Sequence, residues 1–148
     1  MTQLKPENPA KAFLKRYRAM MRRRESLQRS IDGALDRATS CTSKPKEVSV
    51  CGSPASYDRM ADDVVTALDG TEQLRRVIRE IDTELNDILT AIDAVPDEMQ
   101  KTILTMRYVE GMQWDGINEQ LHIDRSWGNK LHGRALWHVK KWLTERGK

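Results

Sequence analysis

Apolar side chains recur at steps of three and four residues through two long stretches of the chain. The first stretch comprises Phe13, Tyr17, Met20, Leu27, Ile31, Ala34 and Ala38, with Arg24 as its interruption. The second comprises Leu74, Ile78, Ile81, Leu85, Ile88 and Ile92, and its phase extends back through Met60, Val64, Ala67 and Thr71. This spacing places apolar side chains on one face of an α-helix. The pattern predicts two long helices.

Residues that cap helices or form loops mark the ends of these two helices. Asn8 followed by Pro9 is typical of a helix start, since Asn caps with its side-chain oxygen and Pro fits the first helical position. Residues 39–56 are rich in Ser, Thr, Pro and Gly and predict a loop. The second helix is expected to run from there to Asp93. Gly70 weakens it, because glycine costs about 1 kcal/mol relative to alanine within a helix.

The apolar stripe on both helices is narrow, as in the seam of a coiled coil. The loop is long enough for the chain to return antiparallel, which makes a hairpin the simplest arrangement. A bundle of several chains, in which each helix finds its seam partner in another subunit, stays open. We expect a homo-oligomer, with this seam lined by Tyr17, Leu27, Ile31, Leu74, Ile78, Ile81, Leu85 and Ile88.

Charge is strongly segregated along the chain, although the net charge is only +3. Residues 1–38 carry a net +6 and residues 57–96 a net −6, followed by −4 over residues 97–124 and +6 over residues 125–148. Basic blocks separated by acidic ones indicate a polyanionic partner, internal pairing of opposite charges, or both. The two long helices carry opposite charges and would attract each other.

Proline at position 96 ends the second helix, because it disfavours helical geometry in the residue before it and fits the first turn of a new helix. A third helix is expected to extend to about Val109. Glu110 and Gly111 then provide a stop, since glycine readily adopts the left-handed conformation found at helix ends.

The remaining residues predict two more helices joined by a three-residue turn. The fourth helix spans about Trp114 to Leu121, and the fifth runs from Arg125 to about Glu145 with Asp124 as its cap. The apolar residues of the fifth helix are Leu131, Ala135, Leu136 and Val139. Two short helices of which the second is basic form a helix-turn-helix pattern, whose second helix offers its first turns to base edges in the major groove.

These elements predict an all-α protein with two regions. Residues 1–94 would form a long helical hairpin or coiled-coil oligomerisation region that includes the loop over 39–56. Residues 95–148 would form a helix-turn-helix DNA-binding domain.

The C-terminal motifs resemble region four of bacterial sigma factors. The segments that carry this resemblance are 96–104, 106–111, 114–117, 121–123 and 134–136. Most of the chain also resembles a family of small phage-encoded regulators of Gram-positive bacteria, which are sigma-like helix-turn-helix proteins related to phage late-gene activators. This second resemblance is carried by residues 50–54 with the acidic helix after them, 113–117 and 131–136.

The resemblance implies specific DNA contacts. Arg125, Ser126, Asn129 and Lys130 match positions that face the bases, and their side chains have suitable donors and acceptors. Arg107 and Trp114 match positions that touch the DNA backbone. Trp127, Arg134, Lys140 and Lys141 are further candidates for backbone contacts, which set register and affinity.

Position 128 departs from the sigma-like pattern, because Gly128 stands where a branched apolar residue is usual. The neighbouring Trp127 would either turn inward to fill the gap or remain exposed to stack on sugar and base. The other indoles of this region, those of Trp114, Trp137 and Trp142, are interpreted mainly as core or interface anchors. His132 and His138 are expected to pack at helix surfaces.

The function that this pattern favours is a phage or prophage transcriptional regulator. It would bind double-stranded promoter DNA, activate phage genes and contact host RNA polymerase. One alternative is an oligomeric DNA-packaging protein of the small terminase type. Another is an interaction protein that binds RNA polymerase without DNA.

Several other classes of protein are not indicated by the sequence. The spacings of a nucleophile with its base, a metal cluster or a phosphate-binding glycine loop are absent, so we expect neither an enzyme nor a cofactor, metal or small-molecule substrate. Cys41 and Cys51 are expected to be free thiols in the loop. No apolar stretch is long enough for a membrane span or a secretory signal, and we expect the cytoplasm of a bacterial host cell.

Overall fold

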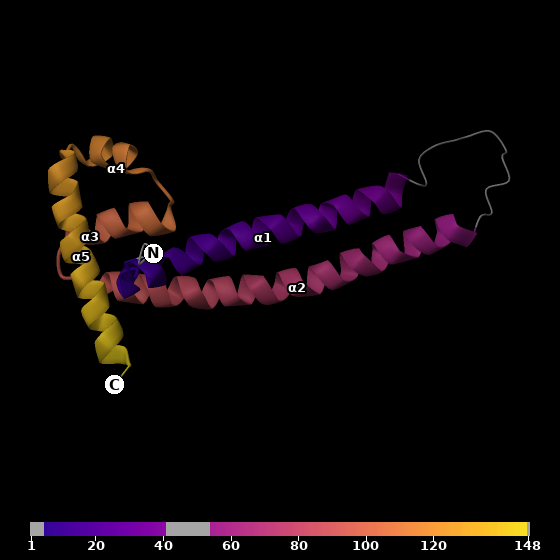
Figure 1. The fold of residues 1–148 in the computed structure, drawn as a ribbon, viewed down its shortest axis with the longest axis horizontal. Helices are drawn as coiled ribbons and strands as arrows, with labels where there is room; N and C mark the ends of the chain where they lie inside the picture. The colour runs from indigo at the N-terminus through magenta and orange to yellow at the C-terminus, as the bar shows by residue number, and fades with distance from the viewer. Residues whose placement is uncertain (1–4, 41–53, 148) are drawn as a thin grey trace. The chain divides into compact units, whose positions relative to one another are not determined.

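The computed structural model describes residues 5–40 and 54–147. Over these residues the protein is all-α, as the apolar pattern predicted, and has no strand. The elements in chain order are α1 (Pro9–Ser40), α2 (Pro54–Asp93), α3 (Glu98–Leu104), the π-helical η1 (Thr105–Val109), α4 (Trp114–Leu121) and α5 (Arg125–Arg146) (Figure 1). None of the described helices is both long and apolar enough to cross a lipid bilayer.

The local signals at the start of α1 and within α2 have clear structural roles. The Oδ1 atom of Asn8 accepts a hydrogen bond of 3.0 Å from the backbone N–H of Ala10, which confirms the expected cap. Helix α2 is continuous through Gly70. A Cβ atom at this position would lie 2.8 Å from Cγ1 of Ile31, so the glycine permits close approach of α1 and α2. Residues 41–53, which include Cys41 and Cys51 of the expected loop, lie outside the described residues.

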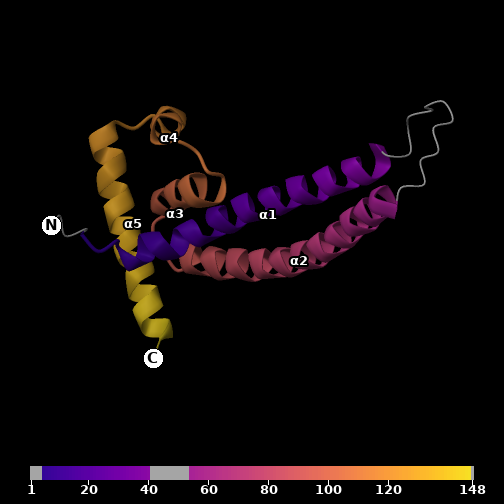
Figure 2. The ribbon, with the colours of Figure 1, turned by 45° about the vertical axis from the view of Figure 1, so that its right-hand side comes forward.

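The chain divides into two compact units, of which the second comprises Met21–Glu80. In this unit the parts of α1 and α2 run antiparallel and side by side (Figures 1 and 2). The buried apolar residues of the unit are Ile31, Ala34, Ala38, Ala67 and Val77. The Nε atom of Arg37 also donates to Oδ1 of Asp63 across the pair at 3.3 Å. The two long helices therefore pair within one chain.

The buried row of this unit differs from the expected seam at one position. Ile31 is buried, and Leu27 and Leu74 are half-buried, but the side chain of Ile78 is 36% exposed. Val77 is buried in its place. Helix α2 thus turns the residue before the expected one toward the interior, and Ile78 lies at the edge of the contact.

The other unit comprises Met1–Met20 and Ile81–Lys148. Its main core combines the start of α1, the end of α2 and the C-terminal helices, and consists of Ala10, Phe13, Leu14, Ile88, Ala91, Ile92, Val95, Leu104, Tyr108, Ala135, Leu136 and Val139. The ring centroids of Phe13 and Trp142 are 6.1 Å apart across this core. Of the expected seam residues in this unit, Ile81 and Ile88 are buried, and Tyr17 and Leu85 are half-buried.

The boundaries of this unit differ from the division expected between residues 94 and 95. The reason is that both long helices contribute large apolar side chains to the same core as α5. Ion pairs join these segments as well: Arg16 contacts Glu84 at 3.5 Å, and Arg146 contacts Asp87 at 3.2 Å.

A second, smaller core holds α4 against its neighbours. It consists of Ile103, Met106, Ile117 and Leu131, flanked by the half-buried Met112, Trp114, Leu121 and Ile123. The expected third helix is present as α3 followed by η1, in which the backbone N–H of Glu110 donates to the carbonyl of Thr105, five residues earlier, at 3.0 Å. This wider turn carries the buried Met106 into the small core and Tyr108 into the main core.

Candidate nucleic-acid interface

The turn between α4 and α5 has defined backbone geometry at both ends. His122 ends α4 in the left-handed conformation with φ of 54°. Asp124 then caps α5, because its Oδ1 atom accepts a hydrogen bond of 2.6 Å from the backbone N–H of Trp127. The cap and the helix positions match those expected from the sequence.

The residues expected to read bases lie exposed in the first two turns of α5. These residues are Arg125, Ser126, Asn129 and Lys130. Their side chains make no hydrogen bond or ion pair with other residues of the described chain. Their donors and acceptors are therefore available to a ligand.

Aromatic rings and cations alternate farther along the exposed side of α5. The guanidinium carbon of Arg134 lies 5.6 Å from the ring centre of Trp127, which is 43% exposed. One long step onward, the Nζ atom of Lys141 lies 5.7 Å from the ring centre of Trp137, which is 59% exposed. Such cation–π contacts hold the charged groups beside the rings.

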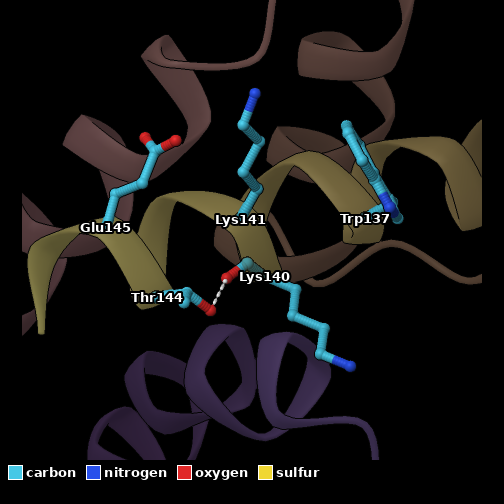
Figure 3. A pocket seen from close by; sticks show the side chains of 5 residues that line it. All are labelled: Trp137, Lys140, Lys141, Thr144 and Glu145. Atoms are coloured by element: carbon cyan, nitrogen blue, oxygen red, sulfur yellow. Dashed lines mark hydrogen bonds between the residues drawn. The ribbon is translucent and has the colours of Figure 1, made fainter.

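Trp137 belongs to a shallow hollow that the sequence interpretation did not identify. Lys140, Lys141, Thr144 and Glu145 complete its lining, and all five side chains come from α5 (Figure 3). Thr144 donates from its hydroxyl to the backbone carbonyl of Lys140 at 3.0 Å, whereas the ammonium groups of Lys140 and Lys141 point away from the helix (Figure 3). Trp137 was expected mainly as an anchor, and its exposure instead adds an aromatic surface to the basic face.

Arg107 and Trp114, which match backbone-contacting positions, form part of an internal network. Both are half-buried. The guanidinium of Arg107 donates from Nη1 to the backbone carbonyl of Met112 at 2.9 Å and lies 5.3 Å from the ring centre of Trp114. Trp114 meets the imidazole of His132 edge-on at 4.7 Å. These contacts orient Arg107 and Trp114 beside α5.

His132 and Tyr108 connect this network to the π-helical turn. The Tyr108 hydroxyl and Nε2 of His132 share a hydrogen bond of 2.7 Å. Burial raises the pKa of Tyr108 to about 12. Burial, together with the charges of Lys11 and Arg107, lowers the pKa of His132 to about 4. The imidazole is therefore neutral near pH 7 and fixes one side of α5 to η1.

Gly128 solves a local packing problem instead of leaving a gap. It is buried, and a Cβ atom there would lie 2.6 Å from Oδ1 of Asn118 on α4. The glycine thus allows α4 and α5 to approach closely. Trp127 does not fill this site, because the exposed indole lies against Arg134.

The charge of α5 makes its exposed side suitable for a polyanion. Six of its residues are Lys or Arg and only Glu145 is acidic. Arg146 is the one basic residue of α5 that forms an ion pair within the described chain. Among the described residues no group of three or more His, Cys, Asp or Glu side chains is arranged to hold a metal ion.

Comparison of the chain with protein families, curated proteins and solved structures finds no match.

Proposed function

We propose that the protein is a DNA-binding transcriptional regulator that places the first turns of α5 in the major groove. The observation that carries this proposal is the exposed set Arg125, Ser126, Asn129 and Lys130, positioned by a capped helix start and unpaired within the described chain. Arg and Lys donate to guanine O6 and N7, and Asn pairs with adenine. Ser addresses either kind of base.

Phosphate contacts would come from the cations that continue along the same helix. Arg134, Lys140 and Lys141 are exposed, and cation–π contacts position two of them. Because phosphate neutralisation releases counterions, these residues would supply affinity without sequence preference. Trp127 would pack against the sugar-phosphate backbone beside Arg134.

Regulation of phage genes is the role that the sequence resemblance favours for this interface. The likeness of the C-terminal motifs to sigma region four supports binding to promoter DNA and contact with host RNA polymerase. Activation is favoured over a full sigma function, because the described helices include no separate domain that would melt and hold the promoter.

Two lysine variants test the assignment of α5. DNA sites selected from a random pool by the purified protein provide the preferred sequence. Replacing Lys130 with Ala should reduce the affinity for that sequence by about 1–3 kcal/mol and relax the preference at one base pair. Replacing Lys140 with Ala should instead weaken all sequences about equally. Binding titrations on preferred and scrambled duplexes measure both effects.

The salt dependence of binding provides an independent check. The logarithm of the binding constant should fall linearly with the logarithm of salt concentration, with a slope of about −0.9 for each phosphate neutralised, and Lys140→Ala should make the slope shallower. Equal losses on preferred and scrambled DNA for Lys130→Ala would reject its role in base reading. Undetectable binding at about 50 mM salt would reject DNA as the ligand.

A further inference from the structure

One flank of the helix pair in Met21–Glu80 is apolar although no described residue covers it. Leu68 is 65% exposed, and Leu35, Val64 and Ile78 are also exposed. Leu35, Leu68 and Ile78 each directly follow a buried residue in the sequence, namely Ala34, Ala67 and Val77. These apolar residues are therefore regularly placed relative to the contact between α1 and α2.

This regular placement puts the exposed residues on the same side of the pair. Successive residues of an α-helix are about 100° apart, so the residue after a buried one lies to one side of the helix contact. In an antiparallel pair that side is the same for both helices. Leu35 on α1 thus shares a flank with Leu68 and Ile78 on α2, and Val64 extends the flank by one helical turn from Leu68.

The opposite flank, formed by the residues that precede the buried ones, lacks large apolar side chains. It consists of Ser30, Gly33, Arg37, Thr66 and Arg76. An apolar stripe that extends beyond the seam on one side only is typical of helices that pack against further helices on that side. The buried residues within the unit include three alanines, so the two helices by themselves form a thin core.

We propose that a second copy of this chain docks on the flank formed by Leu35, Val64, Leu68 and Ile78, which gives a two-fold symmetric four-helix arrangement. The contact is self-complementary in charge. Glu25 on α1 and Arg75 on α2 follow Arg24 and Leu74 in the expected seam phase, and so lie on this flank. Both are exposed and have no ion-pair partner among the described residues.

Two-fold symmetry makes use of these opposite charges. When α1 of one copy lies along α2 of the other, Glu25 of each copy can approach Arg75 of its partner, and both pairs form at once. The apolar residues of the two flanks become buried together. This inference does not depend on DNA binding, because none of its residues belongs to α5.

Two variants that flank the same buried alanine distinguish this face from its opposite. Leu68→Glu places a charge on the proposed contact, and Thr66→Glu places the same charge on the polar flank. Sedimentation equilibrium of the full chain should give twice the monomer mass of 17.1 kDa for the natural protein and for Thr66→Glu. Leu68→Glu should weaken dimerisation by about tenfold or more. Circular dichroism should show the same helical content in all three.

Charge exchange tests the pairing without removing apolar contacts. Glu25→Arg and Arg75→Glu should each weaken the dimer by about fivefold, and the double variant should restore it. A monomeric natural protein at all accessible concentrations, or a ring of many subunits, would overturn the proposal. Equal dissociation by Thr66→Glu and Leu68→Glu would also overturn it. Site-specific DNA binding by a monomer would leave the proposed function in place while removing this inference.

Discussion

His132 lies half-buried between α5 and the π-helical turn, where it shares a hydrogen bond with Tyr108 and contacts the edge of Trp114. The sequence indicated only that this histidine packs at a helix surface. Its partners come from residues 18 and 24 positions away, which no local pattern connects to it. The structure makes it the link between the helix proposed to read DNA and the scaffold behind it.

This environment predicts a pH dependence of stability. The pKa of His132 is lowered from 6.5 to about 4, so between these values the unfolded chain binds a proton that the folded chain does not. The free energy of unfolding should therefore be full above about pH 6.5 and fall as the pH drops toward 4. We expect a loss of about 1–2 kcal/mol from this residue, reduced by the partial exposure of the ring.

Urea unfolding at pH 7.5 and pH 5 measures this effect. His132→Gln should show a smaller difference between the two pH values than the natural protein. His138→Gln, which retains His132, serves as the matched control and should keep the full difference. An unchanged pH dependence in His132→Gln would show that other groups cause it.

Single residues also show where sequence interpretation reaches its limit. Gly128 was interpreted as a departure that leaves a gap, whereas the structure places Asn118 so close that a side chain at position 128 would collide with it. The exposed indole of Trp137 was expected mainly as an anchor. Both outcomes depend on which residue of another helix, or none, occupies the adjacent space.

At the scale of elements, the start of α5 is set by local chemistry that the sequence already displays. Asp124 has the extended backbone of a cap, and its carboxylate accepts from the N–H of Trp127 at 2.6 Å. The cap stabilises the turn from which Arg125 and Ser126 project. The helix start proposed to enter the groove is thus a defined structural element.

Replacing Asp124 tests the contribution of this cap. Asp124→Ala should lower the free energy of unfolding by about 1 kcal/mol, because the N–H groups of the first turn lose their acceptor. Asp124→Asn should cost only a few tenths of this amount, because Asn caps about as well as Asp. Thermal unfolding followed by circular dichroism compares them. Equal stability of the two variants would contradict the role of the cap.

For the whole molecule, the main core determines which residues must be present together. Phe13 and Leu14 of α1 and Ile88 and Ile92 of α2 are buried in the same cluster as Leu136 of α5. The C-terminal helices thus depend on segments that the sequence had placed in a separate domain. The apolar pattern identified these residues as buried, but it did not show with which helices they pack.

This dependence predicts the behaviour of fragments. A peptide spanning residues 95–148 should show weak helicity and no cooperative thermal transition, because it loses the α1 and α2 part of the main core. Residues 5–20 joined by a Gly-Ser linker to residues 81–147 should recover cooperative unfolding. The 3.5 Å contact between Arg16 and Glu84 shows that these segments lie close enough to join. A cooperative transition in the short peptide would contradict the prediction.

The sequence by itself determined that this protein is all-α and where most of its helices begin and end. Apolar periodicity, caps and proline act over a few neighbouring residues, so their effects can be read along the chain. Only the tertiary structure decided that Val77 and not Ile78 faces α1, that both long helices contribute to the core of α5, and that Trp137 lies exposed. These features depend on contacts between residues far apart in the chain, whose geometry local patterns do not encode.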